Sequence, residues 1–84
     1  MEEQEHQLKI LPQYFDRVKR GIKTFEVRYN DKDFQSGDKV SLNEWDMRKS
    51  KCSGNQIDIK ITYVFKDSLD GIDTGYCVFG FIKQ

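Results

Sequence analysis

No stretch of this 84-residue chain is both long and apolar, and its first residues are polar. A membrane-crossing helix needs about 20 consecutive apolar residues, and a secretory leader needs an apolar core behind a basic start. The two cysteines, Cys52 and Cys77, lack the close spacing of a zinc or redox motif. We therefore expect a cytoplasmic protein in a reduced compartment, with no membrane partner, no metal and no cofactor.

An excess of charge of one sign is also missing, because 14 basic residues balance 14 acidic ones. A neutral chain cannot hold a long nucleic-acid duplex by electrostatics alone. The charge is nevertheless uneven: residues 17–28 contain five basic residues and one acidic residue, Glu26. This distribution favours a small or local anionic ligand. The basic residues are Arg17, Lys19, Arg20, Lys23 and Arg28.

The chain is short for a domain that folds alone. A chain of this length buries only about 60% of the surface that it exposes when unfolded, so one core is all it can form. Six Phe, four Tyr and one Trp supply that core, since each aromatic side chain buries roughly 150–250 Å². We expect a single domain over residues 6–84, preceded by a polar, frayed segment at residues 1–5.

Hydrophobic periodicity predicts one helix and five strands. Alternation over residues 6–10 indicates a strand, and three- and four-residue spacing then predicts a helix from Pro12 to about residue 20, closed by Gly21. Alternation returns over residues 24–29, from residue 39 and over 57–65, and an apolar run over 76–82 predicts the last strand. Residues 46–55 are predicted to form a polar hairpin loop and residues 66–74 a polar connection. The order favours an α+β fold in which the helix plugs a curled, mostly antiparallel sheet or small barrel.

The strand over residues 24–29 has two different faces. Phe25, Val27 and Tyr29 share one face, and we expect it to join the core. Glu26 and Arg28 lie side by side on the opposite, less apolar face.

Two later strands also carry informative patterns. Glu44 shares the inward face of Leu42, whereas Trp45 faces the other way. A carboxylate on an inward face needs a partner or lies at the mouth of a cleft. In the strand over residues 57–65 the odd-numbered residues are all apolar and predict one continuous face. The strand over residues 76–82 is apolar on both faces, which places it inside the sheet.

Several other residues have structural interpretations. His6 shares the face of Leu8 and is expected to be a hydrogen-bonded structural residue. Phe34 is expected to anchor a turn that ends at residues 37–38, and Cys77 to be a small buried hydrophobe.

Two segments in register resemble a known family. They are Gly21-x-Lys23-x-x-Glu26-x-Arg28 and Phe34-x-x-Gly37-Asp38-x-Val40, and they are similar to the ASCH domain of the PUA-like superfamily. The resemblance covers residues 6–82 and is strongest to a short bacterial and phage subfamily. It implies a small PUA-like β-barrel with one helix between the first two strands. It also implies a cleft near the helix that binds RNA or nucleotides.

The charged residues of the motif fit such a ligand. Lysine and arginine can hold a phosphate while a carboxylate accepts hydrogen bonds from a base edge or a ribose hydroxyl. We therefore expect a module that binds RNA, a nucleotide or a modified nucleoside, as a monomer or weak homodimer. The expected ligand-binding residues are Lys9, Lys23, Glu26, Arg28, Asn30, Glu44 and Trp45.

Three alternatives stay open. The first is a small amidohydrolase, because some ASCH proteins remove an acetyl group from a modified cytidine with a lysine and a threonine of this motif. Glu26 occupies the threonine position here, so the nucleophile is missing and catalysis ranks below recognition. An enzyme would use Lys23, Glu26 and Glu44. The second alternative is a protein-interaction module of phage or mobile-element origin, marked by an exposed apolar patch. The third is a surface ion pair without further function, in which Glu26 and Arg28 pair with each other or with Lys9 on the neighbouring strand.

Overall fold

The computed structural model describes residues 4–66 and 71–84. It has the predicted order of one helix between the first two of five strands. The elements are β1 (Glu5–Ile10), α1 (Pro12–Lys19), β2 (Phe25–Tyr29), β3 (Lys39–Asp46), β4 (Lys51–Phe65) and β5 (Tyr76–Lys83).

The frayed start predicted for residues 1–5 lies mostly outside the described residues. Of that segment, Glu5 is the first residue of β1. The N–H of Gln4 donates to Asp38 Oδ1 at 3.1 Å, and its carbonyl accepts from Lys39 N at 3.0 Å. Residues 4 and 5 are thus held against the start of β3.

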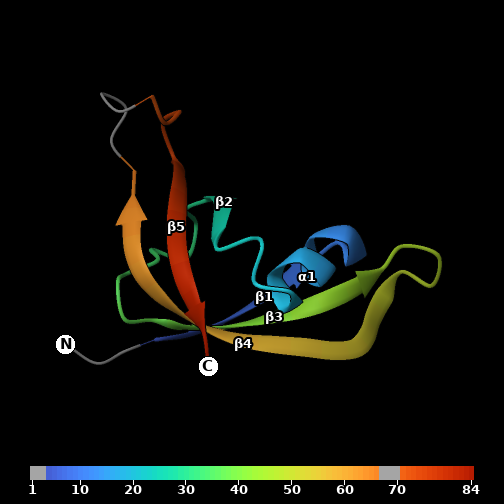
Figure 1. Cartoon of the computed structure of the whole chain (residues 1–84). Helices are drawn as coiled ribbons and strands as arrows, with labels where there is room; N and C mark the ends of the chain where they lie inside the picture. Colours follow the sequence, from blue (N-terminus) through green and yellow to red (C-terminus); the bar gives the residue numbers. More distant parts are fainter. Residues whose placement is uncertain (1–3, 67–70) are drawn as a thin grey trace.

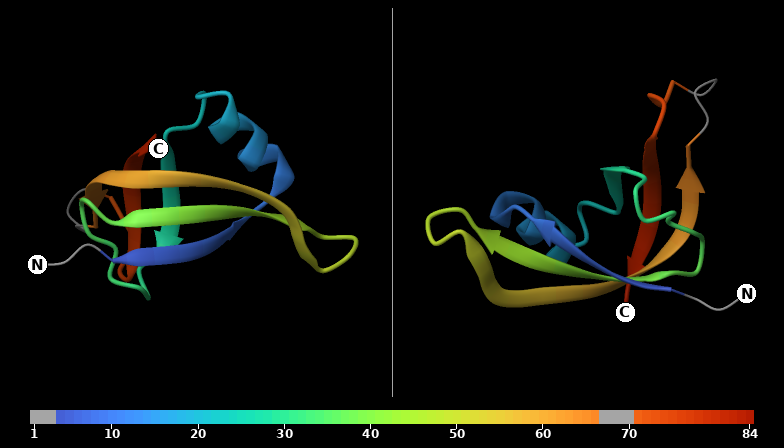
Figure 2. Two further views of the ribbon diagram at one scale, coloured as in Figure 1. Left: turned by 90° about the horizontal axis from the view of Figure 1, so that it is seen from below. Right: turned by 180° about the vertical axis from the view of Figure 1, so that it is seen from behind.

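The five strands form one mixed sheet in the order β1-β3-β4-β5-β2. β1 runs parallel to β3, and every other neighbouring pair is antiparallel. The sheet curls into a half-barrel because β4 bends along its 15 residues: its first part pairs with β3 and its last part rises beside β5 (Figure 1). α1 lies over the concave side (Figure 2). The result is a small, barrel-like α+β fold, as predicted.

The helix follows its sequence signals closely. Pro12 occupies the first turn, where its missing N–H costs nothing, and Phe15 and Val18 are buried against the sheet. Gly21 adopts φ +77° and ends the helix. Its N–H donates to Val18 O at 3.0 Å, and Ile22 N donates to Arg17 O at 2.9 Å. This pair of bonds is the Schellman motif, which glycine favours.

The core fills the concave side of the sheet. Every strand except β2 contributes apolar residues to it, together with α1 and the turn residue Phe34. Cys77 and Phe34 are buried as predicted. The strands contribute Leu8, Ile10, Val40, Leu42, Ile59, Ile61, Cys77, Phe79 and Phe81.

Two details of the strands differ from the predictions. The apolar face of β4 is not continuous, because the β4–β5 register shifts between Ile61 and Tyr63. The shift turns Tyr63 and Phe65 outward and Val64 toward the core. β5 lies inside the sheet as predicted, but only one of its two faces is buried.

The predicted loop over residues 46–55 is shorter than expected. The ladder continues through the pairs Trp45↔Cys52 and Asp46↔Lys51, so that β4 begins at Lys51. The carboxylate of Asp46 caps the turn by accepting from the N–H groups of Arg48 and Lys49. Polar side chains on both faces concealed this strand, because backbone pairing holds it together without burial.

No helix among residues 4–66 and 71–84 is long and apolar enough to cross a bilayer.

Candidate functional site

The charged residues of β2 face into the half-barrel, and its apolar residues face out. Glu26 is opposite Phe79 on β5, and Arg28 is opposite Cys77. Cross-strand partners share a face, and Phe79 and Cys77 are fully buried, so Glu26 and Arg28 must be on the inner face. Glu26 is only 5% exposed, whereas Val27 and Tyr29 are 58% and 60% exposed. The alternation was predicted correctly, but the assignment of the apolar face to the core was wrong.

Glu26 is buried with a cation at each of its oxygens. Lys23 Nζ pairs with Oε1, and Arg28 Nε donates to Oε2 at 3.0 Å. A buried carboxylate is tolerated when it is paired and hydrogen-bonded in this way. Since two cations share one carboxylate, the cluster has a formal charge of +1. Both cations are partly exposed, with side chains 17% and 26% accessible.

Arg28 also joins the two edges of the sheet. Its Nη2 donates to the backbone carbonyl of Lys9 on β1 at 2.7 Å, although β1 and β2 are the outermost strands of the sheet. The open side of the half-barrel is therefore bridged by one guanidinium group. We call the group Lys23, Glu26 and Arg28 the seam cluster.

Two aromatic rings lie beside the seam cluster. Lys23 Nζ is 5.7 Å from the ring centre of Tyr14 on α1 and 5.2 Å from that of Phe25 on β2. Its position is fixed further by a 2.6 Å hydrogen bond to the carbonyl of Phe25. A cation within about 6 Å of a ring face is attracted to it. Tyr14 and Phe25 are themselves partly exposed, so the cluster combines accessible positive charge with accessible rings.

Lys9 and Trp45 lie on the other side of the sheet from the seam cluster. The side chain of Lys9 is exposed, and its Nζ lies 4.3 Å from the centre of the Trp45 ring. Lys9 takes part in the cluster only through its backbone carbonyl. Glu44 lies opposite the buried Ile10 of β1, and both Glu44 and Trp45 border a hollow between the start of α1 and the β3–β4 hairpin.

Glu44 forms a separate polar group near the β3–β4 hairpin. Its Oε1 accepts from Ser53 Oγ at 2.7 Å and from Asn55 Nδ2 at 3.1 Å. It borders a shallow hollow of about 400 Å³ between the start of α1 and the hairpin. No hydrogen bond or ion pair within the described part of the chain connects Glu44 with the seam cluster.

Asn30 has a structural position in the turn after β2. Its Oδ1 accepts from Phe34 N at 2.9 Å, and its own N–H donates to Gly75 O at 2.7 Å. The seven predicted ligand-binding residues are thus brought together only in part. Lys23, Glu26 and Arg28 are in direct contact, Lys9 adds a carbonyl, and Asn30, Glu44 and Trp45 lie in other groups.

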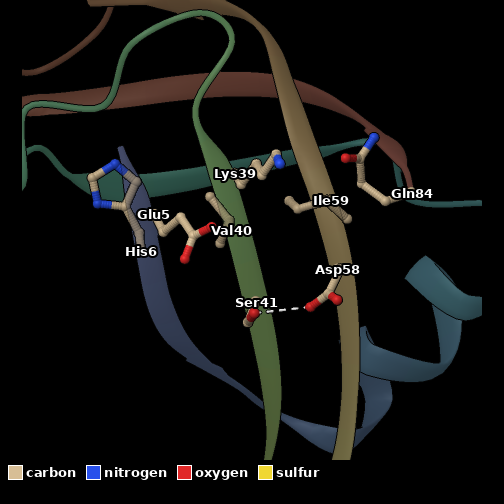
Figure 3. Close-up of a pocket in the computed structure, with 8 residues that line it drawn as sticks. All are labelled: Glu5, His6, Lys39, Val40, Ser41, Asp58, Ile59 and Gln84. Carbon is tan, nitrogen blue, oxygen red and sulfur yellow. Dashed lines mark hydrogen bonds between the residues drawn. The ribbon is translucent and has the colours of Figure 1, made fainter. Parts of the chain in front are cut away.

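A second hollow, of about 300 Å³, lies over β1, β3 and β4 and is lined by none of the seam-cluster residues (Figure 3). Ser41 Oγ donates to Asp58 Oδ1 across it at 2.8 Å, and Glu5 and Lys39 line its rim. None of its polar lining residues belongs to the charged motif over residues 21–28. We therefore place the candidate site at the seam cluster.

The fold holds a second buried carboxylate, at Asp38. His6 Nε2 lies 2.8 Å from Asp38 Oδ2, and both residues are buried, which confirms the structural interpretation of His6. Burial alone would raise the pKa of Asp38. The hydrogen bonds from His6 and from the N–H groups of Gln35 and Gln4 outweigh that effect and hold the pKa below its ordinary value. This pair ties β1 to the turn before β3.

The described residues contain no group of three or more His, Cys, Asp or Glu side chains that could hold a metal ion. Burial raises the pKa of the Cys77 thiol, despite Lys66 nearby, and so disfavours a nucleophilic thiolate there.

Sequence reasoning missed two members of the site, Tyr14 and Phe25. Tyr14 was assigned to the apolar face of the helix, but it lies at the margin of that face and is 40% exposed. Phe25 was assigned to the core. An available signal was its place directly between Lys23 and Glu26, within the motif itself.

Comparison with known proteins places this chain in a family. The model of the family described as "Domain of unknown function (DUF3850)" matches residues 5–81. The chain is also 34% identical over 59 residues to the "Uncharacterized 12.9 kDa protein in GpA 3'region" of Escherichia phage P2. That alignment covers 70% of this chain but 52% of the phage protein, so the chain spans about half the length of this relative. The matched residues run from the start of β1 into β5, so the match covers the helix, four whole strands and most of β5. The chain therefore belongs to the DUF3850 family.

Proposed function

We propose that this protein is an ASCH-like, PUA-like module that binds RNA or a nucleotide at the seam cluster. The observation that carries the proposal is the composition of that cluster: two partly exposed cations held by one buried carboxylate, with aromatic rings beside them. The curled five-stranded sheet agrees with a small barrel, and the ASCH-like motif coincides with the cluster.

Glu26 acts in this proposal as a positioning residue. Both of its oxygens are engaged by Lys23 and Arg28, so it holds the two cations close together. The remaining N–H groups of the lysine and arginine then donate to a phosphate, and a charge-assisted bond of this kind is stronger than a neutral one. Fixing the cations in advance reduces the entropy lost on binding.

The neighbouring rings define the rest of the ligand. Tyr14 and Phe25 flank Lys23 and offer faces on which an unpaired base can stack, worth about 1–3 kcal/mol per base. A base in a duplex is already stacked on its neighbours and presents no free face. The ligand class is therefore a single-stranded RNA segment or a free nucleotide.

The proposal is tested by titrating the protein with short single-stranded RNAs and mononucleotides by calorimetry. Lys23→Ala should weaken binding about tenfold and lower the salt dependence by roughly one counterion, because one phosphate contact is lost. Glu26 keeps Arg28 as a partner in this variant, so the fold should persist. Lys32→Ala removes the same charge from an exposed turn and is the matched control. Equal affinities of Lys23→Ala and Lys32→Ala would contradict the proposal.

Hydrolysis of a modified nucleoside is the lesser alternative. A general base needs a free oxygen near its substrate, and each oxygen of Glu26 is engaged by a cation. Glu26→Gln separates the two roles. If Glu26 positions the two cations, Glu26→Gln should weaken RNA binding, because the amide offers one acceptor oxygen to Lys23 and Arg28 in place of two. Catalysis by Glu26 instead predicts that the wild type turns over an acylated cytidine and that this turnover disappears in Glu26→Gln.

A further inference from the structure

The outer face of the β4-β5-β2 part of the sheet is apolar, and most of its side chains are exposed among residues 4–66 and 71–84. Cross-strand pairs place Val78 between Phe65 and Val27, and Tyr76 beside Tyr29. We call this surface the outer platform; it consists of Val27, Tyr29, Tyr63, Phe65, Tyr76 and Val78. Exposed fractions reach 65% at Tyr63. None of the six residues is charged.

The rings of the platform are held in place although they are exposed. Tyr29 and Tyr76 meet edge to face with centroids 5.4 Å apart, and Tyr63 and Phe65 lie 6.3 Å apart. Gly75 leaves room for Tyr29: a Cβ at that glycine would lie 2.9 Å from the ring. Such preorganised aromatic side chains lose little entropy when a partner covers them, and they are typical of interface anchors.

From this geometry we infer that the outer platform is a self-association surface, on which a second copy of the chain packs face to face. Charge supports a second copy over a nucleic acid. The platform offers no cation for a phosphate, and the chain has a formal net charge of zero, so two copies do not repel each other.

The size of the platform fits a weak dimer. A fully exposed aromatic side chain presents roughly 200 Å², and about half of that area is exposed in each ring of the platform. The four aromatic side chains and two valines together therefore expose about 500 Å². Two copies would bury about 1,000 Å² in total, the lower limit for a specific interface. A hollow of about 390 Å³ at the edge of the platform is open to a side chain of the facing copy; it is lined by Val27, Tyr76 and Val78 together with Gly71, Ile72 and Asp73.

The platform is independent of the seam cluster. Val27 and Tyr29 point outward from β2, while Glu26 and Arg28 point inward. One strand thus supplies an inner charged pair and an outer apolar interface. Phe25, which flanks Lys23, is not one of the six platform residues. Variants of one face should not alter the other.

The inference is tested by sedimentation-equilibrium ultracentrifugation of the whole chain over a wide range of concentration. The wild type should show a reversible monomer–dimer equilibrium. Val27→Lys and Tyr63→Lys place a charge on the platform and should each raise the dissociation constant at least about tenfold. Met47→Lys adds the same charge at an exposed residue of the hairpin and should leave the equilibrium unchanged, as should Lys23→Ala.

Thermal unfolding of each variant checks that it folds; both platform positions are more than half exposed, so a lysine fits at either. A wild type that stays monomeric at every concentration would overturn the inference, as would a dimer that neither platform variant weakens. Binding of RNA to the platform, seen as loss of RNA affinity in Val27→Lys, would overturn it too.

Discussion

The two faces of β2 reverse the usual arrangement of a half-buried strand. The inner face carries Glu26 and Arg28, and the outer face carries Val27 and Tyr29. Its neighbour in the sheet, β5, has apolar residues on the inner face, with Phe79 fully buried. The difference shows that charged side chains enter the interior when they satisfy one another, and that an apolar face left outside is available to a partner.

The largest expected effect contrasts two aromatic residues on opposite faces of the sheet. Phe79→Ala should lower the free energy of unfolding by about 4 kcal/mol, because it opens a cavity in a closely packed core. Tyr63→Ala should change it by less than about 1 kcal/mol at concentrations where the protein is monomeric, since Tyr63 is mostly exposed. Urea denaturation measures both. Similar losses for the two variants would mean that the outer platform is part of the monomer's core.

A smaller effect is expected for the guanidinium that bridges β1 and β2. Arg28→Ala removes the hydrogen bonds to Glu26 and to the Lys9 carbonyl and leaves the buried carboxylate with Lys23 alone. The free energy of unfolding should fall by about 2 kcal/mol. The double variant Glu26→Leu/Arg28→Leu should recover part of that loss, because no unpaired charge stays buried. Arg20→Ala breaks an exposed ion pair with Asp16 and is the control. If Arg28→Ala lowers the free energy of unfolding no more than Arg20→Ala does, the seam cluster stabilises the fold no more than a surface ion pair.

The smallest effect concerns the other buried carboxylate. Because folding lowers the pKa of Asp38, its charged form stabilises the native state above the unfolded pKa, and that stabilisation is lost as pH falls below about 4. Acid should therefore remove about 1 kcal/mol through Asp38. Asp38→Asn should flatten the acid limb of the stability curve measured by urea denaturation. An unchanged acid limb would show that Asp38 does not contribute to it.

Local sequence signals specified most of the fold. Proline at the first turn, the three- and four-residue spacing and Gly21 marked α1. Alternation indicated β1, β2, β3 and the second part of β4, and an apolar run indicated β5. What the sequence did not reveal was the geometry between strands. The register shift after Ile61 turned Tyr63 outward, and the polar start of β4 lacked the apolar alternation that marks a strand.

The candidate site was predictable in its residues but not in its orientation. The motif predicted Lys23, Glu26 and Arg28 as site residues, and in the structure both cations form ion pairs with Glu26. Alternation along one strand shows that two faces differ, but it does not show which face the neighbouring strand buries. The pairing with β5 determines which face of β2 is inside, because Phe79 and Cys77 are buried opposite Glu26 and Arg28. Contacts between distant segments, such as the hydrogen bond from Arg28 to the Lys9 carbonyl, produce no local hydrophobic periodicity from which they could be predicted.

The division of β2 into a ligand-binding face and an association face is tested most directly by an NMR titration with a short single-stranded RNA at low protein concentration. The side-chain Nε–H of Arg28 reports on the inner face, and the methyl groups of Val27 report on the outer face. The account predicts that RNA shifts the Arg28 signal and leaves the Val27 methyl signals in place. Shifts of the Val27 methyl groups with an unmoved Arg28 signal would contradict it.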